Sequence, residues 1–368
     1  MLLCRSVTGL CRALAIGVGL TLALPGIADP QAEFTVAFKA YQEAMEASAY
    51  VVAAGHAEKA RRLGEQVYPD DIKVQATLAF NHGYALAMTG FRNPAYRELK
   101  EARKLMRRAY GSDSAELLQV EMSLLNTVPD EHARRQLDRV LKLTALHYPE
   151  DSEVMAEVKL NGGMQVWWSP RAERLLGEAA ETFGRLGETE RVARAKFWIG
   201  KIHLGRERYP QAVESMTTVV ELLPADDTTA LMARANLVEA YEELGDSDRA
   251  TEHCLAIGQT VPWMGTAEYQ PLFKRVPTYP RSALTRNAEG YVLLEFAVDE
   301  MGFVREPKVV DSKLGTQVSG MTESAIVRAF EDAAIDAAER FRYAPKFVDG
   351  QPVTVEGVRN RIVFEMRR

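Results

Sequence analysis

The segments Arg342-Tyr343-Ala344-Pro345 and Asp349-Gly350-Gln351-Pro352-Val353 decide the fold of the C-terminal part of this chain. Proline cannot donate to a strand ladder, so Pro345 marks a strand end. An Asp-Gly pair favours a two-residue hairpin turn, because glycine readily adopts positive φ. The two segments therefore predict short strands joined by a tight turn.

The residues before these segments predict the longer elements of the same domain. From Tyr291 to Asp299 one strand face is expected to carry Val292, Leu294, Phe296 and Val298, and these alternate with Tyr291, Leu293, Glu295 and Asp299, as in a half-buried strand. Gly302 closes a hairpin that returns as residues 303–311. Residues 322–341 are expected as a helix, and residues 343–348 and 355–366 as strands. The helix carries an apolar stripe of Ile326, Phe330, Ala333, Ala337 and Phe341. We therefore expect an antiparallel sheet covered by one helix.

The ordered motifs of this region resemble the C-terminal domain of the TonB energy-transducer family, over about residues 269–368. The positions that carry the resemblance are Tyr279, Pro280, Gly290, Gly302, Tyr343, Pro345, Asp349 and Gly350. The resemblance implies recognition by strand addition, in which an exposed sheet edge binds a short extended segment of an outer-membrane β-barrel receptor. Most of these residues have structural roles, so the motif predicts a fold more firmly than an activity.

The final strand, residues 358–366, is the candidate edge for such docking. An unpaired row of N–H and C=O groups is a template for another strand, and arginines beside it would favour an acidic partner. The partner-binding candidates are Arg359, Arg361, Val363, Glu365 and Arg367. That the arginines simply keep an exposed edge soluble is an equally open interpretation.

Residues 33–262 are predicted to be helical throughout, because Ala, Leu, Glu and Arg dominate and period-2 alternation is nearly absent. A punctuation element recurs at spacings of 42, 38, 35, 40 and 38 residues, which is typical of two-helix units. In it, a proline or glycine ends one unit and acidic residues cap the next. The element stands at Tyr68-Pro69-Asp70-Asp71, Tyr110-Gly111-Ser112-Asp113, Tyr148-Pro149-Glu150-Asp151, Phe183-Gly184, Leu223-Pro224-Ala225-Asp226-Asp227 and Val261-Pro262.

The last two units, residues 193–226 and 231–264, resemble the tetratricopeptide repeat, with small residues such as Gly200 and Ala250 where helices would touch. Stacked units form a superhelix whose concave face commonly holds a peptide or a partner helix. A rigid spacer without a ligand of its own is the equally open alternative.

Trp167 and Trp168 are the least expected residues of the helical array, because adjacent aromatics on a helix cannot both face one core. We expect one of them to be exposed or to pack on a loop. Core packing at a helix end is favoured over contact with a partner.

The first 28 residues differ from the rest. Arg5 and Arg12 precede an apolar run that ends in Pro25-Gly26-Ile27-Ala28, which is typical of a signal peptide cleaved after Ala28. The run is short for a spanning helix, which needs about 20 apolar residues. We therefore predict export to the periplasm of a Gram-negative type cell, with an inner-membrane anchor facing the periplasm as the alternative. Cys254 would then be the one cysteine of the mature chain, expected in a helix-packing face.

Composition argues against several classes of function. The chain has 45 Lys and Arg against 51 Asp and Glu, so its net charge of −6 offers no bulk attraction to nucleic acid. Its six histidines are dispersed, and no zinc, P-loop or nucleophile-elbow motif occurs. We therefore expect no enzymatic activity, no metal site and no cofactor.

These observations predict a chain with a signal peptide at 1–28, a tetratricopeptide-like array at 33–262, a linker at 263–276 and a TonB-like α+β domain at 277–368. The expected function is that of a protein–protein adaptor in envelope transport, which docks on an outer-membrane receptor or another envelope protein. An atypical membrane-anchored energy transducer is an alternative, although residues 13–28 lack the ionisable residue that couples such a helix to a proton-driven complex. A stand-alone envelope scaffold, or a homodimer formed through the sheet, is a further alternative.

Overall fold

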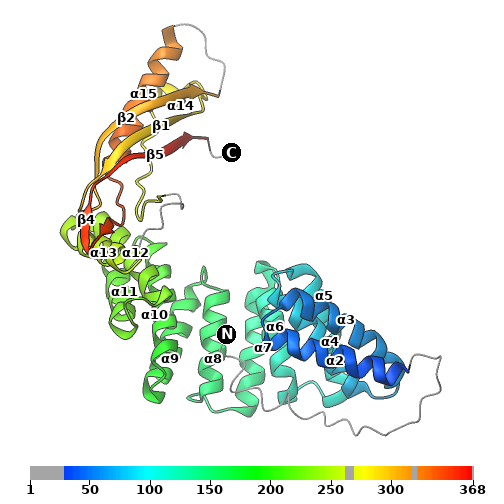
Figure 1. The fold of residues 1–368 in the computed structure, drawn as a ribbon. Coiled ribbons are helices and arrows are strands. Elements are labelled where there is room, and N and C mark those ends of the chain that lie inside the picture. The colour runs from blue at the N-terminus through cyan, green and yellow to red at the C-terminus, as the bar shows by residue number, and fades with distance from the viewer. Residues whose placement is uncertain (1–28, 262–268, 316–320, 367–368) are drawn as a thin grey trace. The chain divides into compact units, whose positions relative to one another are not determined.

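The computed structural model describes residues 29–261, 269–315 and 321–366 (Figure 1). The chain divides into two compact units, residues 1–129 and residues 130–368. The predicted signal peptide lies outside the described residues. Within those residues, no helix is long and apolar enough to cross a membrane.

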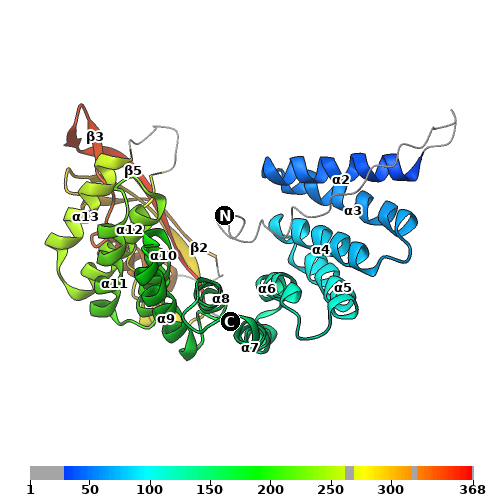
Figure 2. The ribbon, with the colours of Figure 1, turned by 90° about the horizontal axis from the view of Figure 1, so that it is seen from below.

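The first unit is built from helices that pack as neighbours in chain order (Figure 2). Asp29 and Asp71 begin two of them, because each carboxylate accepts backbone N–H groups of the first turn. Phe34 packs edge-on against Tyr68 at 5.4 Å between ring centroids. The helices are α2 (Pro30–Glu46), α3 (Tyr50–Val67), α4 (Ile72–Met88), α5 (Arg92–Tyr110), the 3-10 helix η1 (Ala115–Leu117) and α6 (Leu118–Thr127).

The second unit begins with seven more helices among its described residues. Asp227 caps one of them, and Gly245 ends it in the left-handed conformation at φ 77°. They are α7 (Asp130–His147), α8 (Glu153–Gln165), α9 (Pro170–Leu186), α10 (Thr189–Leu204), α11 (Tyr209–Leu222), α12 (Thr228–Leu244) and α13 (Ser247–Thr260). From α8 onward they form three consecutive helix pairs, each packed on the next.

The close contacts within these pairs use small residues, as expected. Gly200 of α10 lies so near α11 that a Cβ there would be 2.7 Å from Cε of Met216. Two of the predicted boundaries between helical units were wrong in detail. Gly184 lies inside α9, which continues to the left-handed Gly187, and Ser152 caps α8 in place of the acidic residues before it.

The C-terminal domain contains a three-stranded antiparallel sheet in the order β2-β1-β5. Along β1 the side chains of Val292, Leu294, Phe296 and Val298 are buried, which confirms the predicted alternation. A separate hairpin, β3–β4, turns through Asp349 and Gly350, both with positive φ. The elements are α14 (Arg281–Leu284), β1 (Gly290–Val298), β2 (Val304–Leu314), α15 (Met321–Ala338), β3 (Lys346–Val348), β4 (Gln351–Val353) and β5 (Val355–Phe364).

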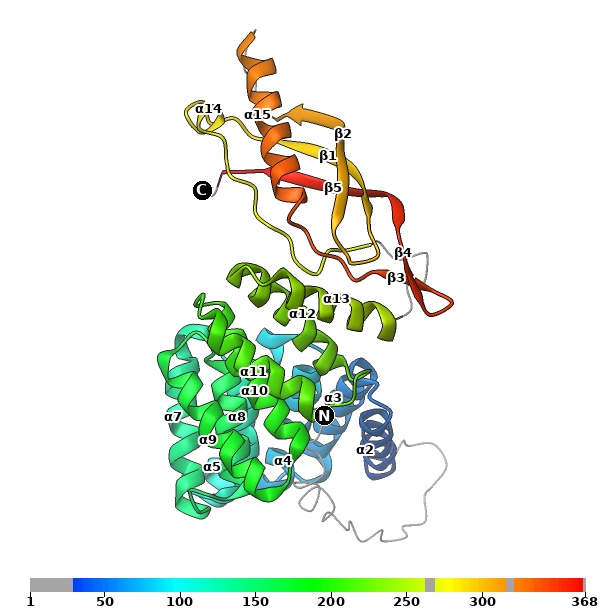
Figure 3. The ribbon, with the colours of Figure 1, turned by 90° about the vertical axis from the view of Figure 1, so that its left-hand side faces the viewer.

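Helix α15 covers one face of this sheet (Figure 3). Phe330 of α15 stacks on Phe364 of β5 with ring centroids 4.3 Å apart. Ile326 and Phe341 are also buried, so the predicted apolar stripe faces the core. The helix ends at Ala338, three residues before the predicted end, because the chain turns there to pair Arg342 with Phe273. For the same reason β3 begins at Lys346 and not at Tyr343.

The predicted fold class is confirmed: a stack of helix pairs of tetratricopeptide type precedes a small α+β domain with an antiparallel sheet and a packed helix.

Candidate functional site

Strand β5 lies at an outer edge of the three-stranded sheet, since β1 is its one strand neighbour among the described residues. Its buried face is formed by Val358, Ile362 and Phe364, which contribute to the domain core. The alternate residues therefore point to solvent. The edge proposed for docking has no further strand beside it among the described residues, and strand addition requires such an edge.

The predicted arginines of β5 lie on the open face of the sheet, and the first of them already has a partner. Arg359 stands opposite Glu295 of β1, and its Nε donates to Oε2 of Glu295 at 2.8 Å. Both side chains are largely in water, so the pair contributes less than about 1 kcal/mol to stability.

Arg361 has a different environment. Its guanidinium lies 3.7 Å from the centroid of the Tyr291 ring, and the Tyr291 hydroxyl donates to Oδ2 of Asp311 at 2.7 Å. This hydrogen bond raises the pKa of Tyr291, and the nearby Arg361 opposes the shift. Among the described residues, no carboxylate lies within ion-pair distance of Arg361. Arg361 is therefore a fixed cation with free donors on the open sheet face.

The remaining predicted docking residues are only partly placed. The side chain of Val363 is 50% exposed next to Arg361. Glu365 follows the end of β5 and is exposed. Arg367 lies outside the described residues. The structure therefore brings Arg359, Arg361 and Val363 together on one face, and partner binding by these residues stays a prediction.

The motif residues hold this edge in place. Tyr279 packs between Phe330 and Phe364, with both ring centroids at 5.7 Å, and its hydroxyl donates to the carbonyl oxygen of Ala288 at 2.5 Å. Pro280 precedes α14 as its N-cap. A Cβ at Gly290 would lie 2.4 Å from the carbonyl oxygen of Lys313, so only glycine allows β1 and β2 to approach there.

Tyr343 and Pro345 are buried between the sheet and the last helix pair. Burial raises the pKa of Tyr343 to about 12, so this phenol stays protonated. Tyr269 packs on its ring at 5.0 Å and donates to the carbonyl oxygen of Ala344 at 2.5 Å. Tyr269 falls in the predicted linker, and this part of it is therefore packed on the domain.

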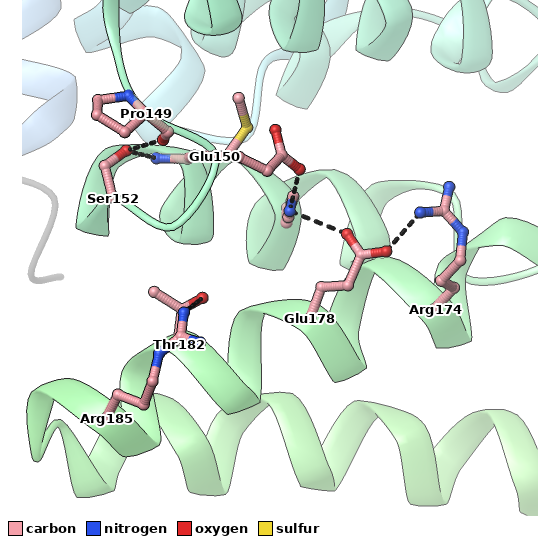
Figure 4. A network of polar contacts seen from close by, with 9 residues as sticks. Pro149, Glu150, Ser152, Arg174, Glu178, Thr182 and Arg185 are labelled. Atoms are coloured by element: carbon pink, nitrogen blue, oxygen red, sulfur yellow. Dashed lines mark hydrogen bonds and ion pairs between the residues drawn. The ribbon is translucent and has the colours of Figure 1, made fainter.

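A network of charges lies within the helical array, between α8 and α9 (Figure 4). The Lys159 side chain is 8% exposed, and its ammonium contacts Glu150 at 2.6 Å and Glu178 at 2.9 Å. Burial lowers the pKa of Lys159, but hydrogen bonds to the two carboxylates outweigh burial and raise it overall. Arg174 also donates to Glu178. This network was not predictable from the sequence, because its members lie up to 28 residues apart and follow no motif.

Trp167 and Trp168 lie in the turn between α8 and α9, with 47% and 39% of their surfaces exposed. Their rings meet edge-to-face with centroids 6.3 Å apart. The expected core packing at a helix end is wrong, because α8 stops at Gln165 and the fully buried Val166 occupies the core position.

Arg342 is the residue whose role the sequence analysis missed. Its side chain is 1% exposed, and its guanidinium donates to Glu242 of α12 and Thr251 of α13 at 2.5 Å each. These partners are 100 and 91 residues away in the sequence. The small residues of α13 were the available signal, since they mark a face that another element can approach closely.

Residues 275–366 match the protein family described as the Gram-negative bacterial TonB protein C-terminal. The resemblance inferred from the sequence motifs is therefore confirmed over these residues. No curated protein matches the chain.

Parts of the chain are similar to several solved structures. BtubC (BKLC) from P. vanneervenii is 18% identical, with a TM-score of 0.43, over 62% of this chain and 89% of that one. A putative kinesin light chain with nearly identical tetratricopeptide-like repeats, from Podosopora anserina, is 15% identical with a TM-score of 0.43, over 52% and 94%. The TPR2AB domain of yeast Sti1, solved with pHSP90, is 15% identical with a TM-score of 0.24, over 62% and 91%.

Proposed function

We propose that this chain is a periplasmic adaptor of the Gram-negative envelope, whose TonB-like domain docks by strand addition on an extended segment of an outer-membrane receptor. The match of residues 275–366 supports an envelope protein of TonB type. The observation that carries the docking is the position of β5 at the edge of the sheet.

The open face beside β5 supports a choice among partner segments. A strand added to β5 would place every second side chain next to Arg359, Arg361 and Val363. Arg359 is already neutralised by Glu295, whereas Arg361 has no carboxylate among its described neighbours. Arg361 therefore favours an acidic residue on the partner strand, and Val363 favours an apolar residue two positions along.

The array of helix pairs is proposed to position the docking domain and to bind a peptide or a partner helix of another envelope protein. This part of the proposal rests on the helix-pair architecture, since stacked units present extended surfaces to partners.

Photo-crosslinking from position 365, an exposed residue directly after β5, to outer-membrane proteins, in cells that produce the full chain, tests the docking edge. Val363→Pro should abolish the crosslink, because proline cannot serve a ladder as donor and its ring obstructs a neighbouring strand. Val310→Pro is the matched control, because Val310 is an exposed bulge residue of β2, on the opposite edge of the sheet. If a folded Val363→Pro protein crosslinks as well as the Val310→Pro protein, β5 is not the docking edge.

The choice of partner is tested by a second pair of variants. Arg361→Ala should weaken crosslinking about two- to fivefold, as expected for loss of one cross-strand charge pair. Arg359→Ala should change it less, because Glu295 already occupies that arginine. Equal losses in both variants would contradict the role given to Arg361.

Export is tested by the mass of the mature N-terminus. A chain that begins at Asp29 agrees with a periplasmic adaptor, and one that retains residues 1–28 agrees with the membrane-anchored alternative.

A further inference from the structure

The C-terminal domain contacts the last helix pair of the array, α12 and α13, and its strands β3 and β4 lie against α13 (Figure 3). Thr251, Cys254 and Gly258 of α13 are spaced by three and four residues, so they share one helix face. All three are buried. We call the contact of this face with residues 342–345 the α13 seam.

The polar centre of the α13 seam is Arg342. Besides Glu242 and Thr251, its guanidinium reaches the carbonyl oxygen of Met301 at 3.4 Å and lies 3.7 Å from the centroid of the Phe303 ring. The side chain of Glu242 is only 12% exposed. A buried arginine and its carboxylate are costly to separate, because each would lose its partner away from water.

The backbone around Arg342 joins the same contact. Its N–H donates to the carbonyl oxygen of Phe273 at 3.0 Å, and its own carbonyl accepts from Leu272 at 2.7 Å. Phe273 belongs to the hydrophobic cluster of α10 to α13, together with Leu237 and Cys254. One residue of the C-terminal region therefore completes the core of the last helix pairs.

The approach of the backbones at the α13 seam leaves no room for a larger residue. A Cβ at Gly258 would lie 2.2 Å from the carbonyl oxygen of Pro345 and 3.2 Å from the ring of Phe347. Arg275, two residues after Phe273, adds an ion pair to Glu243 of α12 at 2.7 Å.

We infer that the C-terminal domain is the terminal cap of the helical array, locked to α12 and α13 through Arg342, so that the docking domain and the last helix pair open and unfold together. Stacked repeats need such a cap, because the end helix would otherwise expose the face that an inner helix buries. This inference does not depend on the proposed docking at β5. It implies that a partner held by the last helix pair carries the C-terminal domain with it.

Cys254 supplies a probe of the seam within the chain itself. It is fully buried, its surroundings include Arg342, and burial raises the pKa of its thiol to about 11. In a Cys4→Ser, Cys11→Ser background it is the single thiol of the full chain, so its labelling by a thiol reagent measures opening of the seam.

Two seam variants have matched controls. Gly258→Ala should speed labelling of Cys254 by at least about tenfold, because the added methyl group separates the backbones. Gly177→Ala in α9 should leave it unchanged, because a Cβ there meets nothing within 4 Å. Arg342→Met should act like Gly258→Ala, and Arg340→Met, at an exposed arginine two residues away, should not. Labelling of Gly258→Ala or Arg342→Met at the rate of its control, with helical circular dichroism retained, would overturn the inference.

Hydrogen exchange of the unsubstituted full chain, followed at increasing urea concentration, tests the inference without any variant. Amides of α13 and of α15 should merge into one opening transition. If α15 opens at a lower urea concentration than α13 and leaves the protection of α13 unchanged, the domain is not the cap of the array.

Discussion

The carbonyl oxygen of Gly302 accepts the N–H of Tyr343 at 2.9 Å, and a Cβ on Gly302 would lie 2.2 Å from the carbonyl oxygen of Tyr343. Gly302 has φ 83° in the β1–β2 hairpin. The β1–β2 hairpin can therefore pair with the backbone of Tyr343 only because residue 302 has no side chain.

Gly302→Ala should for this reason destabilise the protein by about 3 kcal/mol or more, the sum of left-handed strain and displacement of the Tyr343 backbone. Gly350→Ala is the matched control, since Gly350 has φ 77° but open space around its Cβ. It should cost about 1–2 kcal/mol, from strain alone. Urea unfolding of both variants measures the difference. Equal losses of unfolding free energy would show that the Tyr343 backbone can move away from an added Cβ without cost.

Two substitutions of Tyr279 distinguish the contribution of its hydrogen bond to stability from the contribution of its aromatic packing. Tyr279→Phe should cost about 1 kcal/mol, because the carbonyl oxygen of Ala288 loses its donor. Tyr279→Ala should cost about 3–5 kcal/mol, since the ring fills the space between Phe330 and Phe364. The same urea experiment decides the order. A larger effect of the phenylalanine variant would contradict the packing role.

In the network around Lys159, removal of a carboxylate should reduce the stability of the protein more than removal of the lysine. Glu178→Gln leaves the buried Lys159 with the single exposed partner Glu150 and should cost about 1–3 kcal/mol. Lys159→Met should cost less than about 1 kcal/mol, because Glu150 and Glu178 both reach water. Thermal unfolding of the two variants measures this asymmetry. A greater loss of stability in Lys159→Met than in Glu178→Gln would contradict this, because it would show that the ion pairs of Lys159 stabilise the protein by more than the burial of its charge destabilises it.

His253 should make the last helix pair sensitive to mild acid. Burial, aided by the neighbouring Arg234, lowers the pKa of His253 from 6.5 to about 4. The folded state therefore binds fewer protons than the unfolded state between these values. The contribution of neutral His253 to stability is complete above pH 6.5, falls as the pH drops below 6.5, and is fully lost once the pH has fallen through about 4. After allowance for partial exposure of the ring, the loss is about 2 kcal/mol.

Hydrogen-exchange protection of α13 at pH 7 and at pH 5, corrected for the intrinsic rate, measures this dependence. His253→Phe keeps a ring on Tyr241, where the histidine stacks at 5.7 Å and 12°, and removes the titration. Its protection should change less between the two pH values. An unchanged pH dependence in the variant would assign the effect to another group.

Features set by neighbours in the chain were predictable from the sequence. Alternation along β1 predicted which of its side chains are buried, and Asp349-Gly350 predicted the turn of the β3–β4 hairpin. Both signals depend on residues within one element. Motifs also indicated the family of the C-terminal domain, because several of them occur in a fixed order.

Features that depend on packing between distant elements were not predictable. Nothing in the residues around Arg342 indicates that its partners are Glu242 and Thr251. The local sequence also does not show whether this arginine is buried or exposed. The contact of Arg361 with Tyr291 follows from the β1–β5 register, which the sequence leaves undetermined. The end of α9 at Gly187 was misplaced because an earlier glycine, Gly184, carries the same local signal.

The junction at α13 also bears on how such a protein can change in length. In a stack each helix pair contacts only its neighbours, so pairs before α10 can be duplicated or deleted without disturbing residues 342–345. The last pair has no such freedom, because Thr251 and Gly258 are fitted to the cap. The number of helix pairs can therefore vary during evolution and change the length of the array. The last pair and the C-terminal domain, in contrast, are inherited together as one unit.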